Sequence, residues 1–173
     1  MKTKSIVVCI AVAVFGFGGV VVADAAEQIC ASFEVSSVEA PQTFGVGKYS
    51  AVATSDIIVH VVFPQTFKED HVITLRFSTP NRHLYREIDV PIAPAGTRLP
   101  GTRRLANYPY PVEVKVPEEQ RINGETVASV QVRFPVGGTS IATSSLYGAW
   151  TVNGLIDGKE TRCFRPLTIN IFE

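Results

Sequence analysis

Short runs in which apolar and polar side chains alternate follow one another along most of the chain. Residues 29–35 alternate in this way, which predicts a first strand with one face in water. Residues 57–63 are apolar at every position except His60, as in a central strand that is covered on both faces. After residue 25, no segment of 11 residues keeps its apolar positions at helical spacing. The pattern therefore predicts an all-β domain.

Turn signals separate the later runs. Residues 72–77 and 84–90 alternate on either side of Thr79-Pro80-Asn81, which predicts a hairpin. Asp157-Gly158 is the strongest short hairpin signal in the chain, and it lies between the alternating runs 150–156 and 167–171. These runs predict paired strands in the central and C-terminal parts of the domain.

Two further runs complete the predicted sheet. Residues 126–134 place four apolar side chains on one face and end at Pro135, and Val112–Val116 form a short edge-like strand. Between them, the segment from Pro117 to Glu125 is predicted to be a polar turn region that includes Asn123-Gly124. The total is seven or eight strands, a number and spacing typical of a sandwich or a barrel.

Residues 91–111 interrupt this regular pattern. Five prolines in the segment make a long strand there unfavourable, because proline cannot donate to the hydrogen-bond ladder. The segment is also longer than most connections between strands. It is predicted to be either a functional loop or a loose one.

The end of the chain carries a family resemblance. The stretch Leu146-Tyr147-Gly148-Ala149-Trp150-Thr151-Val152, followed by Asp157-Gly158 and an alternating last strand, resembles the closing hairpin of bacterial secreted immunoglobulin-like domains over residues 146–172. The resemblance implies an immunoglobulin-like antiparallel β-sandwich that forms a single domain over residues 26–173. Trp150 and Tyr147 are then interpreted as core and corner residues.

The N-terminus indicates export. Lys2 and Lys4 precede an uncharged apolar run, and Ala23-Asp24-Ala25 supplies the small residues that signal peptidase accepts, so residues 1–25 are predicted to be a cleaved signal peptide. An uncleaved membrane anchor is the alternative, although the glycines of this run weaken such a helix. The expected location is therefore the periplasm or the extracellular space.

The cysteine count agrees with export. Cleavage removes Cys9 and leaves Cys30 and Cys163, and an even number of cysteines in an exported chain predicts a disulfide. The loop between them is long, so the chain-entropy model gives such a bridge roughly 4–5 kcal/mol of stabilisation. The bridge fits best if the first and last strands run side by side in parallel, as immunoglobulin-type sandwiches allow. The alternative is two free thiols in a reducing compartment.

Charge and motif content exclude several classes of function. The chain has 16 basic and 16 acidic side chains, and this balance speaks against a nucleic-acid-binding surface. His60, His71 and His83 have no metal-type spacing, and no phosphate-binding loop or G-x-S-x-G motif occurs. The adjacent acids Glu118-Glu119 are interpreted as a solvated turn rather than a catalytic pair. No metal, no cofactor and no catalytic residue are predicted, and the protein is expected not to be an enzyme.

One group of residues in the proline-rich segment suits recognition. Guanidinium groups pair with carboxylates or phosphates, and tyrosines supply rigid contact area. The candidates for this binding loop are Arg98, Arg103, Arg104, Tyr108 and Tyr110. A structural interpretation is weighed beside it, in which the arginines keep the loop soluble and the tyrosines pack over the edge of the sheet.

These observations lead to a functional hypothesis. The protein is expected to be an exported, non-catalytic binding or structural domain, an accessory or adhesion component of the cell envelope that binds an envelope or extracellular protein. A carbohydrate-binding module or small secreted hydrolase that uses the loop 98–110 is the alternative, with a glycan as ligand and Tyr85 as a third aromatic candidate. A third hypothesis is a subunit that polymerises through an exposed edge strand, of which Val112–Val116 is the expected one.

Overall fold

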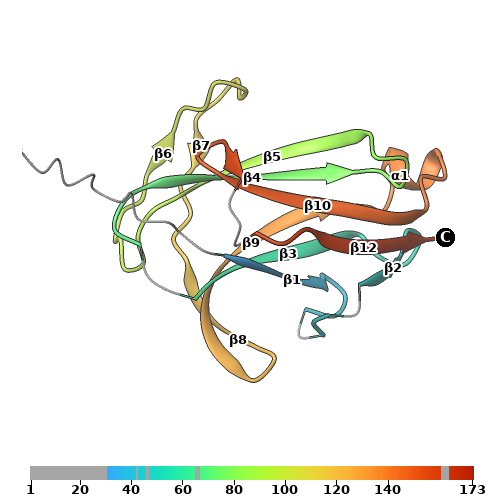
Figure 1. Ribbon diagram of the computed structural model, residues 1–173, viewed down its shortest axis with the longest axis horizontal. Coiled ribbons are helices and arrows are strands. Elements are labelled where there is room, and N and C mark those ends of the chain that lie inside the picture. The colour runs from blue at the N-terminus through green and yellow to red at the C-terminus, as the bar shows by residue number, and fades with distance from the viewer. Residues whose placement is uncertain (1–30, 42, 46, 65–66, 161–163) are drawn as a thin grey trace, which may run out of the picture.

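The computed structural model describes residues 31–41, 43–45, 47–64, 67–160 and 164–173, which form an all-β protein (Figure 1). Two largely antiparallel sheets contribute to one hydrophobic core, an arrangement consistent with a β-sandwich. The expected signal peptide and both Cys30 and Cys163 lie outside the described residues. Within these residues, no helix has the length and apolar character needed to cross a membrane.

The first sheet has four strands in the order β1-β3-β9-β8, and each is antiparallel to its neighbour. The predicted central strand is confirmed, because β3 lies between two other strands and every residue of 57–63 is buried. The bounds of the four strands are β1 (Ser32–Ser37), β3 (Asp56–Phe63), β8 (Glu118–Ile122) and β9 (Glu125–Pro135).

The second sheet follows the order β2-β12-β10-β4-β5. The predicted hairpin on either side of Thr79-Pro80-Asn81 is confirmed as β4 and β5, and the last strand pairs with β10 as expected. The short strand β11 pairs with β10 across Asp157-Gly158. The bounds are β2 (Lys48–Ser50), β4 (His71–Ser78), β5 (Leu84–Ile92), β10 (Gly148–Ile156), β11 (Lys159–Glu160) and β12 (Leu167–Phe172).

The expected parallel pairing of the first and last strands is wrong in one respect. The first strand β1 pairs with β3, and the strand that runs parallel to β12 is β2. After β1 the chain crosses from one sheet to the other, and Gly45 and Gly47 adopt positive φ angles of 76° and 57° in this crossing. The crossing gives the last strand its parallel partner, so an early segment does lie beside it, but not the first strand.

The polar turn predicted at 117–125 is also corrected. Residues Glu118–Ile122 form β8, and the turn itself is confined to Asn123-Gly124, where both residues have positive φ angles of 51° and 90°. Charged side chains on a strand at the end of a sheet oppose pairing with another chain. The strand was missed because its sequence, Glu-Glu-Gln-Arg-Ile, carries the polar residues that protect an edge rather than an apolar alternation.

The core between the sheets contains an aromatic cluster. Trp150 is fully buried on β10, and Phe77 of β4 stacks on Phe134 of β9 with ring centroids 4.0 Å apart. Phe134 and Tyr85 both lie against the Trp150 ring, with centroid distances of 5.8 and 5.1 Å. Aromatic pairs in such tilted and edge-to-face arrangements join the two layers. The core placement predicted for Trp150 is therefore confirmed.

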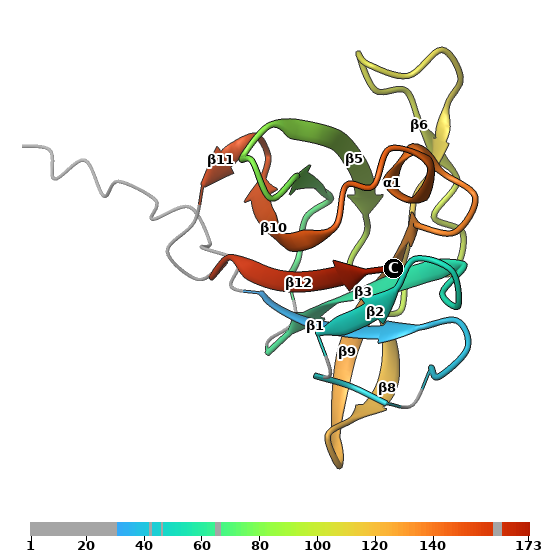
Figure 2. The same ribbon diagram turned by 90° about the vertical axis from the view of Figure 1, so that its right-hand side faces the viewer.

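Two small elements lie outside the sheets. A two-stranded ribbon of β6 (Thr102–Arg103) and β7 (Val112–Glu113) extends from the molecule, and Figure 2 shows it on the opposite side from the β8–β9 hairpin. The single-turn helix α1 (Ser140–Thr143) leads into β10, and the Thr139 hydroxyl caps its N-terminus by accepting from the Ile141 N–H.

Candidate functional site

The proline-rich segment projects from the body of the described chain (Figure 2). Pro91 and Ile92 still belong to β5, which corrects the boundary expected at residue 91. Proline is tolerated there because β5 is the last strand of its sheet and the Pro91 carbonyl bonds to Lys115 rather than to β4, so the backbone of Pro91 faces the open edge. The remainder, 94–113, leaves the sheet, turns back through β6 and β7, and returns. We call residues 94–113 the recognition ribbon.

Two backbone hydrogen bonds and one side-chain bond hold the base of the recognition ribbon on the end of β5, and a third backbone bond, from Val114 to Gly101, joins the two sides of the projection. The Asp89 N–H donates to the Tyr108 hydroxyl at 2.7 Å. The Lys115 N–H donates to the Pro91 carbonyl at 2.8 Å, and the Ala93 N–H donates to the Lys115 carbonyl at 2.9 Å, while the Val114 N–H donates to the Gly101 carbonyl at 3.1 Å. These bonds satisfy the C-terminal half of the β5 edge, which would otherwise lie open.

The five predicted binding-loop residues have two different roles. Tyr108 is half-buried, and its hydroxyl accepts a bond from the β5 backbone where a further strand would otherwise pair. This agrees with the interpretation in which the tyrosines pack over the edge of the sheet. Tyr110 is 78% exposed, and Leu99 beside the arginines is 91% exposed. Arg98, Arg103 and Arg104 are exposed, and among the described residues no carboxylate lies within ion-pair distance of them. The outer part of the recognition ribbon thus offers cations and apolar area.

A flat aromatic platform is not formed by the three tyrosines considered as glycan contacts. Tyr85 turns toward the core, where its ring lies edge-on to Trp150 and its hydroxyl is 2.6 Å from the Ser140 hydroxyl. Tyr108 is bonded to the β5 backbone, so Tyr110 alone keeps an exposed ring. Of the three rings considered for stacking on a glycan, one is therefore available in this arrangement.

The edge strand expected at Val112–Val116 is shorter than predicted. Only Val112 and Glu113 are in strand conformation, and both pair with β6, whereas Lys115 forms an isolated bridge with Ile92. The strands at the ends of the two main sheets are β1, β8, β2 and β5. Among the described residues, these four strands therefore supply the open edges of the two main sheets.

The histidines do not form a metal site among the described residues. His71 begins β4, and its Nδ1 is 2.7 Å from Asp157 Oδ2, while Asp157 Oδ1 also accepts from the Val72 N–H. His83 is exposed in the turn before β5, at the other end of the hairpin from His71. The two histidines therefore do not meet, and the Asp157 carboxylate instead ties the β10 turn to β4.

His60 forms a pair that the sequence did not indicate. Its Nε2 lies 2.9 Å from the Ser36 hydroxyl on the neighbouring strand, and the rings of Phe44 and His60 form a T-shaped pair with centroids 5.1 Å apart. Burial lowers the pKa of His60 from its usual 6.5. The side chain of Gln120 approaches and opposes this shift, but Nδ1 has no partner of hydrogen-bonding geometry among the described residues.

The Ser36–His60 pair has the two groups of a nucleophile and its base, but its position does not suit catalysis. Ser36 is 0% and His60 is 2% exposed and neither lines the hollow described below, so no substrate reaches the hydroxyl in this arrangement. The register that places Glu34 opposite His60 and Ser36 opposite Ile58 could have been found only from the pairing of β1 with β3. Ser36 and His60 therefore form a buried polar contact between β1 and β3.

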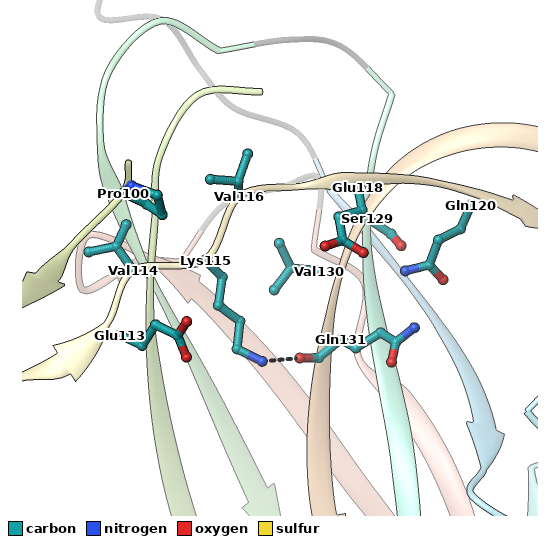
Figure 3. A pocket seen from close by; sticks show the side chains of 10 residues that line it. All are labelled: Pro100, Glu113, Val114, Lys115, Val116, Glu118, Gln120, Ser129, Val130 and Gln131. Atoms are coloured by element: carbon teal, nitrogen blue, oxygen red, sulfur yellow. Dashed lines mark hydrogen bonds between the residues drawn. The ribbon is translucent and has the colours of Figure 1, made fainter. Parts of the chain in front are cut away.

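A hollow of about 430 Å³ lies between the base of the recognition ribbon and the first sheet. Figure 3 shows the side chains of 113–116 on one side and Ser129, Val130 and Gln131 of β9 on the other, with Glu118 and Gln120 of β8 beside them. The Lys115 ammonium donates to the Gln131 carbonyl at 2.8 Å across this hollow. No local sequence pattern indicated this hollow, because its walls come from three separated segments.

Glu118 and Glu119, interpreted above as a solvated turn, lie on β8. Both are exposed, as expected, but successive residues of a strand point to opposite faces, and only Glu118 lines the hollow. They therefore do not act as a pair.

Comparison with known proteins does not assign the chain to a family. No protein-family model matches it, and no curated protein matches it. The fold and the two surfaces described above are therefore the basis for a functional proposal.

Proposed function

We propose that the protein is an exported immunoglobulin-like domain that works by binding a protein of the cell envelope or the extracellular space through the recognition ribbon. The observation that carries the proposal is the ribbon itself. It extends away from the core, it is bonded firmly at its base, and its outer part combines Leu99, Tyr110 and three arginines without acidic partners among the described residues. Interface centres are enriched in arginine and tyrosine.

The order of the strands supports an immunoglobulin-like topology. In that fold the first, second, fifth and fourth strands form one sheet, and the seventh, sixth and third strands form the other. The orders β1-β3-β9-β8 and β12-β10-β4 fit this scheme, with β5 as the additional strand of a variable-type domain and β2 as a second half of the first strand. The parallel pairing of β2 with β12 agrees with it.

The corner before β10 gives further support. Tyr147 precedes the strand that would be the sixth, and its hydroxyl donates to the Ala142 carbonyl five residues upstream at 3.3 Å. A tyrosine that bonds back to the backbone at this corner is a hallmark of immunoglobulin-like domains. The corner role of Tyr147 is part of the same proposal.

Export and the disulfide belong to the proposal as well. The ring of Phe33, three residues after Cys30, packs on the ring of Phe164, which follows Cys163, with centroids 4.8 Å apart. This contact brings together the described residues that follow the two cysteines, and the bridge itself is part of the proposal. N-terminal sequencing of the exported protein is expected to begin at residue 26, and intact mass before and after reduction is expected to differ by two hydrogens.

Cross-linking in the native cell envelope tests the binding function. The wild type is compared with Arg98→Ala/Arg103→Ala/Arg104→Ala, and captured proteins are identified by mass spectrometry. A matched control, Arg121→Ala/Arg133→Ala/Arg165→Ala, removes the same charge from exposed positions elsewhere. We expect one defined protein to be captured by the wild type and the control but lost from the ribbon variant. Equal capture by all three, or capture of nothing, would refute the proposal.

A further inference from the structure

The hollow beside the recognition ribbon exists because β8 is shorter than β9. The last residue pair between them is Glu118 with Ser129, and β9 then continues to Pro135 without β8 beside it. Residues 113–117 cross this gap on their way from the ribbon to β8 (Figure 3). The space left under the crossing, about 430 Å³, falls in the range of small-molecule sites, roughly 300–1,000 Å³.

The walls of the hollow are held in place. The backbone of Lys115 is bonded in both directions, to Pro91 of β5 and to Ala93 just after it, and its ammonium donates to the Gln131 carbonyl of β9. One residue thus links the two sheets at this point. A wall that is already ordered loses little conformational freedom when a ligand binds.

One polar group in the lining lacks a partner. Ser129 is 1% exposed, and its hydroxyl has no hydrogen-bond partner among the described residues. A buried hydroxyl normally forms such a bond, because leaving it unpaired forfeits the bonds that it would make in water. Ser129 lines the hollow, so a hydroxyl-bearing ligand there can supply the missing bond.

The remaining lining determines the class of ligand. It holds carboxylates, carboxamides and one ammonium, and Val114, Val116 and Val130 add an apolar wall. Neither Glu113 nor Glu118 has an ion-pair partner among the described residues. An anion would face these carboxylates, whereas a cation would face Lys115 and the arginines of the adjoining ribbon. A neutral ligand whose groups both donate and accept meets no like charge.

We propose that this hollow is a binding site for a neutral sugar residue. The hydroxyls of the sugar bond to Glu113, Glu118, Gln120, Ser129 and Gln131, and its C–H groups lie against the valines. The site is distinct from the exposed tip of the recognition ribbon and does not require the protein partner proposed above, so the two proposals can fail separately.

Titration by NMR tests the site. The ¹⁵N-labelled protein, produced by export from its expression host, is titrated with glucose, galactose, mannose, N-acetylglucosamine and the tetrasaccharides of glucose and N-acetylglucosamine. Arginine methyl ester and glucuronate serve as the cationic and anionic probes. We expect at least one neutral sugar to shift the amides of Lys115, Ser129 and Gln131 in a saturable way, with a Kd of about 1 mM, as a small polar site allows.

Variants distinguish the lining from the surrounding surface. Glu118→Gln and Ser129→Ala are each expected to weaken binding of that sugar by about tenfold, the usual effect of losing a buried or charge-assisted hydrogen bond. Glu119→Gln is the matched control, since Glu119 is the next residue on β8 and does not line the hollow. Its affinity is expected to equal that of the wild type.

Three outcomes would overturn the inference. The first is that no neutral sugar causes a saturable shift up to about 50 mM, which is far above the expected Kd. The second is that only the charged probes cause a shift. The third is that Glu119→Gln loses as much affinity as the variants of the lining. Because none of these variants changes the arginines of the ribbon, a negative result here leaves the cross-linking test of the ribbon unaffected.

Discussion

Strand β10 and the recognition ribbon place similar side chains in opposite environments. On β10, Trp150 and Val152 are fully buried between two sheets. On the ribbon, Leu99 and Tyr110 are among the most exposed large side chains of the described residues. The difference does not lie in the hydrophobicity of the residues but in the layer opposite them. An apolar side chain is buried only where the topology provides a second surface, and the ribbon has none.

The contrast between the buried strand β10 and the exposed ribbon predicts that the largest loss of stability occurs on substitution of Trp150. Trp150→Ala removes a fully buried indole whose N–H donates to the Leu146 carbonyl at 2.8 Å, and we expect a loss of about 3–5 kcal/mol in the free energy of unfolding. Leu99→Ala on the ribbon is expected to change it by less than about 0.5 kcal/mol. Urea unfolding measures both values, and similar losses in the two variants would contradict the contrast.

A smaller loss is expected from overfilling the core at Gly154 on β10. A Cβ atom there would lie 2.6 Å from Phe33 Cζ and 2.8 Å from Phe164 Cδ1, so both rings must move. Gly154→Ala should cost about 1–3 kcal/mol. In a double-mutant cycle measured by urea unfolding, Phe33→Leu should recover part of this loss, and strict additivity of the two changes would show that the ring contact is not the cause.

Two tyrosines of the ribbon separate its anchored base from its free tip. Tyr108→Phe removes the acceptor of the Asp89 N–H, and we expect a loss of about 0.5–1.5 kcal/mol in thermal or urea unfolding. Tyr110→Phe, at a side chain that is 78% exposed, is the matched control and should leave stability unchanged. Equal losses of stability in the two variants would contradict the distinction between an anchored base and a free tip.

The weakest effect concerns pH and the first sheet. Because burial lowers the pKa of His60, the unfolded chain takes up a proton below about pH 6.5 that the folded chain does not. The free energy of unfolding is therefore expected to decrease as the pH falls below this value, because protonation of His60 favours the unfolded chain. Urea unfolding between pH 5 and 8 should show this slope in the wild type and a shallower one in His60→Gln. Parallel curves would exclude His60 as the cause.

The alternation of apolar and polar residues correctly predicted the strands that have at least one face buried in the core. The runs at 57–63, 72–77 and 84–90 became β3, β4 and β5, because burial on one or both faces selects apolar residues at spacing two. The same argument failed at β8, whose side chains are selected for an exposed edge. It also failed at Pro91, since only the position of β5 at the end of its sheet makes proline acceptable there.

The candidate sites also divide into residues that residue type alone identified and residues that only the tertiary structure brought together. The arginines and tyrosines of the ribbon were found from residue type, but the sequence did not separate Tyr108, which closes the β5 edge, from Tyr110, which is free. The Ser36–His60 contact and the hollow at Ser129 were not found at all. Their residues are far apart in the chain, and no local spacing relates them.

The sequence by itself determined the all-β class, the central strand, the hairpin turns and the core role of Trp150. Each follows from local preferences, namely side-chain alternation, turn residues with positive φ and the burial of large apolar groups. Tertiary structure alone decided that β2 rather than β1 runs beside β12, which tyrosine is an anchor, and where a hollow opens between the sheets. These features depend on pairings between distant segments, whose register is set by the packing of the whole chain.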